Sequence, residues 1–208
     1  MKAASWLLLF GIASSNGRVI NFDTGPLGRT PPEWTAVSSG GHAPRWEIQR
    51  DGSAATLPYV LAQLSSDGGP DRIPLAILKN VTMRDGDVSV RMKPVSGRHV
   101  GGGGLVWRYR DENNYYLVRA SVLEKNVAVY RVHNGQRIAL LPNARHDIPP
   151  NTWRILKVSL RGNRYQVYMD HRRILQGWDN TYTGSGQVGL CTVADSVAYF
   201  DDFRVYPK

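Results

Sequence analysis

The chain has 208 residues, of which 26 are Lys or Arg and 17 are Asp or Glu, for a formal net charge of +9 at pH 7. This length and an apolar fraction of 42% suit one large domain and exclude a disordered chain. The basic residues are spread along the chain without a run of five or a nucleic-acid-binding motif, so we expect no nucleic-acid partner. The single cysteine, Cys191, excludes an intrachain disulfide, and its apolar neighbours predict that it packs as a small buried hydrophobe.

The first fifteen residues have the three-part organisation of a secretory signal peptide. Met1-Lys2 is a positive start, residues 6–13 are an apolar stretch, and Ala13-Ser14-Ser15 fits a cleavage site. The alternative is a buried N-terminal helix. The apolar stretch is shorter than the roughly 20 residues that span a bilayer, so we expect no membrane anchor after signal removal. The sequence therefore predicts a secreted or periplasmic bacterial protein, with residues 16–208 forming a single domain.

Short strands separated by turn signals follow one another along that domain. Hairpin turns are indicated at Asp51-Gly52, Asp85-Gly86, Asn134-Gly135 and Gly162-Asn163. No window of a dozen residues has a helical period, so we expect almost no helix. The predicted strands are Val19–Asp23, Glu33–Val37, Trp46–Gln49, Val60–Gln63, Leu75–Leu78, Asp87–Pro94, Gly104–Arg110, Tyr115–Ala120, Val127–Val132, Arg137–Leu141, Trp153–Leu160, Tyr165–Asp170, Arg173–Trp178, Gln187–Thr192, Ala198–Phe200 and Phe203–Tyr206. This spacing predicts an all-β sandwich or barrel.

Two neighbouring strands alternate clearly enough to assign their faces. If residues 111–114 form the loop, Arg110 lies opposite Tyr115, Arg108 opposite Leu117 and Val106 opposite Arg119. The face expected in the core then carries Leu105, Trp107, Tyr109, Tyr116, Val118 and Ala120. The second face carries Val106, Arg108, Arg110, Tyr115, Leu117 and Arg119. Val127 and Val129 of the next strand suit the core, which adds Asn126, Ala128 and Tyr130 to the second face.

The second face mixes guanidinium groups with aromatic rings. Arginine offers planar forked donors for vicinal hydroxyls, and tyrosine offers a flat ring for the C–H face of a sugar. The candidate glycan-binding residues are therefore Arg108, Tyr115, Arg119, Asn126 and Tyr130. The alternative is an ordinary solvated face on which arginine stems lie over tyrosine rings.

Catalytic and metal signals are weak. Spacing nominates no pair of carboxylates for glycoside hydrolysis, so catalytic residues stay unassigned. The five histidines have no metal-ligand spacing. Asp202, beside the final strand, could bind a structural calcium ion together with Asp23 if the two terminal strands pair, and strand-end capping is the alternative. We expect no other cofactor.

The stretch Gly104–Tyr116 resembles bacterial concanavalin A-like lectin/glucanase domains, and more narrowly the 3-keto-disaccharide hydrolase domain, which is family 16 glycoside hydrolase-like. The tail at 186–205 and the opening Phe22-Asp23, with Trp34 and Trp46, are similar too. The resemblance implies a two-sheet antiparallel jelly roll with a concave, carbohydrate-facing sheet. It maps a Gly-Ile/Leu-x-x-Arg motif onto Gly104, Leu105 and Arg108. The chain departs from it where Gly102-Gly103-Gly104 replaces Asn-Ser-Gly, and where Cys191 replaces a frequent Trp.

These observations lead to a preferred hypothesis and two alternatives. The preferred one is a secreted carbohydrate-recognition sandwich that binds a glycan on its concave sheet. One alternative is a glycoside hydrolase or lyase acting on 3-keto-disaccharides or related glycosides, which rests on the resemblance alone. The other is a non-catalytic protein-interaction sandwich. The sequence leaves open which glycan binds and which oligomer forms.

Overall fold

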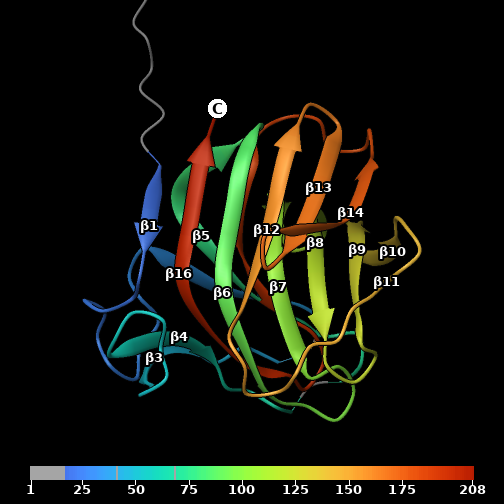
Figure 1. Cartoon of the computed structure of the whole chain (residues 1–208). Coiled ribbons are helices and arrows are strands. Elements are labelled where there is room, and N and C mark those ends of the chain that lie inside the picture. The colour runs from blue at the N-terminus through green and yellow to red at the C-terminus, as the bar shows by residue number, and fades with distance from the viewer. Residues whose placement is uncertain (1–16, 41, 68) are drawn as a thin grey trace, which may run out of the picture.

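The protein is an all-β sandwich of two antiparallel sheets (Figure 1). The computed structural model describes residues 17–208 apart from residues 41 and 68, and within that part no helix is present. It follows that no helix of the described part is long and apolar enough to cross a membrane. The predicted signal peptide, residues 1–15, lies outside the described residues.

Sheet A forms the front layer in Figure 1, where β16, β6, β12, β13 and β14 lie side by side. Its strand order is β14-β13-β12-β6-β16-β4-β3, and β1 also pairs with β16. The strands are β1 (Arg18–Ile20), β3 (Trp46–Arg50), β4 (Tyr59–Gln63), β6 (Gly86–Ser96), β12 (Arg154–Arg161), β13 (Arg164–Met169), β14 (Arg172–Trp178) and β16 (Val197–Pro207).

Sheet B lies behind sheet A in the same view, with the order β10-β9-β8-β7-β15-β5-β2, and β11 also pairs with β9. The strands are β2 (Trp34–Ser39), β5 (Ile73–Met83), β7 (Gly102–Asp111), β8 (Asn114–Ser121), β9 (Asn126–His133), β10 (Gln136–Ala139), β11 (Ala144–Arg145) and β15 (Gly186–Thr192). Most predicted strands are confirmed with longer ends. Three points differ. Strand β1 ends at Ile20 and not at Asp23, β11 was not expected, and the last two predicted strands are one strand, β16, with a bulge between Asp201 and Arg204.

The main core lies between the sheets, where alternate residues of each strand meet. Trp107 and Tyr116 stack there with ring centres 5.5 Å apart, and Trp34 meets Phe203 edge to face. The predicted core positions Leu105, Trp107, Tyr116, Val118 and Ala120 are confirmed, as are Val127 and Val129. Tyr109 was expected in the same core but packs against a second cluster instead.

A β-bulge in β7 explains why Tyr109 points away from the main core, and it changes the register from the predicted one. Asp111 pairs with Asn114, in line with the expected register, but Val106 pairs with Leu117 and Trp107 with Tyr116, two residues away from the expected pairing. The register shifts between Trp107 and Asp111, so the extra residues bulge out of the ladder. A register shift of two residues leaves each side chain on its predicted face, so the face assignment of β7 is correct as far as Trp107. From Arg108 onward the bulge changes the direction of the side chains, and the assignment is wrong.

The glycine run at residues 101–104 leads into strand β7, and Gly104 allows a close contact between two strands. A Cβ added to Gly104 would lie 1.7 Å from the carbonyl oxygen of Val118 on β8, well inside van der Waals contact. Only glycine lets the two backbones approach this closely.

A second hydrophobic cluster covers the outer face of sheet B. It consists of Ile73, Leu75, Ile77, Val106, Tyr115, Leu117, Val132 and Cys191, each at most 2% exposed, with Val37, Tyr109 and Tyr130 packed against it. Cys191 therefore packs as the buried hydrophobe that its neighbours predicted, and burial raises the pKa of its thiol to about 12. Sheet B is thus packed with apolar side chains on both faces. We call the cluster on its outer face the apolar floor, because polar groups lie over it.

Candidate binding site on the outer face of sheet B

A cleft opens at one end of this outer face, where strands from opposite edges of sheet B approach each other. Ser39 ends the edge strand β2, while Gln136 and Arg137 begin the opposite edge strand β10. Residues from both edges line one cleft of about 560 Å³, which we call the edge cleft: Ser39, Gly40, Asp71, Ile73, Asn113, Gly135, Gln136 and Arg137. The outer face of sheet B is therefore hollowed at this end.

The polar groups of the edge cleft are mixed and balanced in charge. One carboxylate, Asp71, faces one guanidinium, Arg137, at 3.8 Å, and the Asp71 side chain is 97% exposed. The other polar side chains in the lining are the Ser39 hydroxyl and the amides of Asn113 and Gln136. Such a set can both donate and accept hydrogen bonds, as a ligand rich in hydroxyl groups requires.

A second group of polar residues, the Arg119 cluster, lies over β8, β9 and the turn between them. It consists of Arg119, Glu124, Asn126 and Tyr130. Arg119 Nη2 donates to Glu124 Oε2 at 2.6 Å and to Tyr130 Oη at 3.1 Å, while Nη1 donates to Asn126 Oδ1 at 3.4 Å. Asn126 Nδ2 in turn donates to Glu124 Oε2 at 3.1 Å, which closes the network. Arg119 is only 4% exposed, so it holds the other three side chains in place from below.

Electrostatics fix Glu124 as a carboxylate. Burial opposes its charge, but the hydrogen bonds from Arg119 and Asn126 together with the charge of Arg119 hold the pKa of Glu124 below its usual range. The carboxylate has a half-exposed side chain, at 39%, and faces a second, shallow cleft with Asn126, Asn143 and Arg145. Glu124 is therefore an acceptor of hydrogen bonds at neutral pH and has no proton to give.

Arg137 joins the Arg119 cluster to the edge cleft. Its guanidinium carbon lies 5.3 Å from the centre of the Tyr130 ring, and that of Arg119 lies 5.7 Å from the same ring. The Arg137 side chain is 28% exposed, and its ion pair with Asp71 is long. Of the two arginines on Tyr130, Arg137 is the one that can turn its donors toward a ligand.

The structure brings together three of the five predicted glycan-binding residues: Arg119, Asn126 and Tyr130. Tyr115 lies on the same face but is fully buried in the apolar floor, where burial raises the pKa of its phenol. Its ring packs at 5.8 Å from that of Tyr109. The expectation that Tyr115 is a solvent-facing ring is wrong, because the outer face of sheet B is hollow and apolar side chains fill its floor.

Arg108 is not on this face. The bulge gives Arg108 a φ of +50° and turns its side chain to the end of the sandwich, where the residue is 3% exposed. Its guanidinium donates to the carbonyl oxygens of Tyr182 at 2.6 Å and Arg84 at 3.2 Å, and to that of Gly162. Arg108 therefore ties the turns of both sheets together, and the prediction that it faces the ligand with Arg119 is wrong.

Arg137, Glu124 and Asp71 were missed by sequence reasoning, although a signal for Arg137 existed. A two-residue Asn134-Gly135 turn pairs His133 with Gln136 and hence Arg137 with Val132, on the same face as Tyr130. Glu124 and Asp71 lie in turns, and no periodic pattern assigns a turn residue to a face.

The terminal strands β1 and β16 do pair, as the calcium hypothesis assumed. Asp202, however, receives hydrogen bonds from Arg91 Nε at 3.1 Å and from Thr56 Oγ1 at 2.9 Å, and Asp23 caps the backbone amide of Tyr59 at 3.2 Å. Among residues 17–208, setting aside 41 and 68, no group of three or more His, Cys, Asp or Glu side chains is arranged to hold a metal ion. The two aspartates act here in ion pairing and capping.

Comparison with known proteins confirms the β-sandwich fold. No protein-family model matches the chain. The levanase of Bacillus subtilis is 28% identical over 170 residues, which cover 81% of this chain but only 22% of that enzyme. The solved carbohydrate-binding module CBM66 from Bacillus subtilis has a TM-score of 0.65 at 21% identity, covering 83% of this chain and 94% of the module. Domain 4 of the extracellular arabinanase AbnA from Geobacillus stearothermophilus, solved with arabinotriose, has a TM-score of 0.55 at 15% identity, covering 92% and 93%.

Proposed function

We propose that the chain is a carbohydrate-binding domain that takes a neutral glycan on the outer face of sheet B. The observation that carries the proposal is the position of Arg137, between the Tyr130 ring and Asp71 and in the wall of the edge cleft. Arg137 and Asp71 supply a donor and an acceptor, and neighbouring amides and a hydroxyl supply both. Because their charges balance, the cleft suits sugar hydroxyl groups better than it suits an ion.

The relatives direct the choice of ligand. A similarity to a carbohydrate-binding module and to a domain solved with arabinotriose favours a glycan over a protein partner. The chain matches about a fifth of the length of levanase, and the name of that enzyme makes levan the first candidate ligand. We further propose that the protein meets this ligand outside the cytoplasm, as a secreted or periplasmic protein, since such polymers are extracellular.

Binding without turnover fits the carboxylates of this face. A glycosidase usually keeps one carboxyl group protonated as the general acid, which needs a raised pKa. The pKa of Glu124 is lowered by Arg119, and Asp71 is exposed beside Arg137. The narrower similarity to 3-keto-disaccharide hydrolases is addressed by incubating the purified chain with a 3-keto-disaccharide, and release of free sugar would replace this proposal by the hydrolase.

The direct test is isothermal titration of the chain with levan, inulin and arabino-oligosaccharides. We expect binding to at least one of them, weakened about tenfold or more in Arg137→Ala, which loses charge-assisted hydrogen bonds. We expect a similar loss in Tyr130→Ala, which removes the ring that positions Arg137. The matched control is Tyr199→Ala, which removes a partly buried tyrosine from sheet A, outside the edge cleft and the Arg119 cluster.

Thermal melting of each variant confirms that it remains folded at the temperature of the titration. Unchanged affinity in folded Arg137→Ala and Tyr130→Ala would move the site away from this face. Absence of binding to a broad panel of neutral glycans would overturn the proposal and favour a protein-interaction sandwich.

A further inference from the structure

The outer face of sheet A differs in charge from the outer face of sheet B. Along β6, β12, β13, β14 and β16, the residues that alternate with core positions point outward. The basic ones are Arg91, Lys157, Arg161, Arg164, Arg173 and Arg204, and the acidic ones are Asp87 and Asp202. Lys93 also points to this side, but it is buried in an ion pair with Asp51. Basic side chains therefore outnumber acidic ones on this face.

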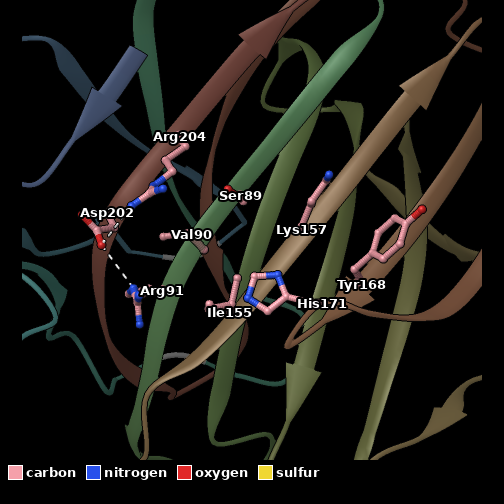
Figure 2. Close-up of a pocket in the computed structure, with 9 residues that line it drawn as sticks. All are labelled: Ser89, Val90, Arg91, Ile155, Lys157, Tyr168, His171, Asp202 and Arg204. Carbon is pink, nitrogen blue, oxygen red and sulfur yellow. Dashed lines mark hydrogen bonds and ion pairs between the residues drawn. The ribbon is translucent and has the colours of Figure 1, made fainter. Parts of the chain in front are cut away.

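A cleft of about 290 Å³ lies within this basic face (Figure 2). We call it the basic cleft; its lining is Ser89, Val90, Arg91, Ile155, Lys157, Tyr168, His171, Asp202 and Arg204. Figure 2 shows Arg91 and Arg204 on one side of the cleft and Lys157, Tyr168 and His171 on the other. Basic groups from four separate elements thus surround one depression.

The carboxylates present do not neutralise all of these cations. Asp202 alone receives both Arg91, at 3.1 Å, and Arg204, at 3.5 Å. Asp87 alone receives both Lys157, at 3.2 Å, and Arg161, at 3.7 Å. Asp201, buried next to Asp202, adds a second carboxyl group on the side of Arg91 and Arg204. On the other side Asp87 is shared between two cations, so a net positive charge remains there. All four basic side chains are between 38% and 47% exposed, which leaves donors free to face a ligand.

We propose that the basic cleft binds a carboxylate or sulfate group of an acidic polysaccharide, at a site separate from the neutral-glycan site on sheet B. Forked guanidinium donors suit such oxyanions. Tyr168 provides one ring, and Lys157 lies 5.3 Å above it, so no open stack of aromatic rings is available for successive nucleobases. The basic cleft itself therefore favours a polyanion built of sugars over a single-stranded nucleic acid.

The experiment measures binding of the full chain to polygalacturonate, dextran sulfate and uncharged dextran at 50 and 200 mM salt. We expect both polyanions to bind and dextran not to bind, with affinity falling as salt rises. Arg91→Gln combined with Lys157→Gln should reduce affinity about tenfold or more. The control removes the same charge elsewhere: Arg29→Gln combined with Lys79→Gln, two exposed residues outside the basic cleft, should change affinity less than about threefold.

Three results would overturn the proposal: equal weakening by the two double variants, which would indicate diffuse net charge; no binding of either polyanion at 50 mM salt; or tighter binding of a single-stranded oligonucleotide of equal charge. Circular dichroism checks that both double variants are folded. Binding of neutral glycan by the Arg91/Lys157 variant, and of polyanion by Arg137→Ala, separates failure of this site from failure of the site on sheet B.

Discussion

The guanidinium carbon of Arg137 lies 5.3 Å from the centre of the Tyr130 ring while the same side chain reaches to within 3.8 Å of the Asp71 carboxylate. One arginine thereby links the edge strand β10, the neighbouring strand β9 and the loop before β5. The planar shape of its side chain is essential to this position, because a flat group can lie on a ring and still present donors at its edge.

Replacement of Arg137 by lysine tests that geometry. We expect Arg137→Lys to lose about tenfold in glycan affinity, although the charge is kept, because an ammonium group cannot stack flat on Tyr130. The free energy of unfolding should change by less than about 0.5 kcal/mol, since the residue is exposed. Titration calorimetry and urea unfolding measure the two quantities. Arg164→Lys, on the opposite sheet, is the control; wild-type affinity in Arg137→Lys would show that charge alone matters.

Arg108 should be important for stability. Its guanidinium donates to three backbone carbonyl oxygens at a site where the residue is 3% exposed, and burial lowers its pKa. A lysine cannot reach all three, so Arg108→Lys leaves buried carbonyls without donors and should cost about 2–4 kcal/mol. Urea unfolding measures this loss. A folded Arg108→Lys protein with normal stability but impaired glycan binding would contradict this structural role and show that Arg108 takes part in glycan binding.

Protonation of Asp201 should stabilise the folded protein as the pH falls from 7 to 5. Burial raises the pKa of Asp201 to about 6, and the neighbouring Asp202 and Asp23 add to the effect. A carboxyl group with a raised pKa in the folded state contributes stability at low pH, and this contribution is lost as the pH rises through about 6. Lowering the pH from 7 to 5 should therefore add about 1 kcal/mol from this group.

The comparison of wild type with Asp201→Asn isolates the effect of Asp201. His146, whose pKa is lowered by burial, opposes the effect in the same pH range, but it is present in both proteins. Carboxylates with lowered pKa, such as Asp51 and Asp195, lose their contributions only as the pH falls below about 4. Urea unfolding at pH 7, 6 and 5 gives the slopes. Identical slopes in the two proteins would show that Asp201 is already charged at pH 5.

Gly104 should tolerate no side chain. A methyl group there would lie 1.7 Å from Val118 O, so Gly104→Ala forces β7 away from β8 and should cost more than about 3 kcal/mol. Gly184→Ala is the matched control, because nothing lies within 4 Å of a Cβ at that position, and we expect no loss. Melting temperatures of both variants are sufficient. A Gly104→Ala protein as stable as the control would show that the two strands can separate freely.

The sequence predicted the strands and most of the core, because alternation and turn residues are local signals. Asn134-Gly135 and Gly162-Asn163 mark real hairpin turns, and Leu105 and Trp107 lie in the core as their alternation indicated. The bulge after Trp107 could not be predicted, since it depends on the pairing of β7 with both β8 and β15. That single irregularity moved Arg108 off the candidate site.

The floor of the site was also beyond sequence reasoning. Tyr115 has the pattern of a solvent-facing residue, but the curvature that brings β2 and β10 to one cleft is a property of the whole sheet. Glu124 and Asp71 reach the site from turns, whose side chains have no fixed direction in the chain pattern. Arg119, Asn126 and Tyr130 were found because all three lie on, or at the end of, two adjacent regular strands.

The apolar packing on both sides of sheet B has a consequence for the order in which the protein opens. Water reaches the backbone of sheet A from its outer side, whereas the amide groups of β7 and β8 are shielded above and below. Hydrogen–deuterium exchange should therefore be slowest in β7 and β8 and faster in β12 and β13. The layer that carries the polar binding groups would then also be the last part of the molecule to unfold.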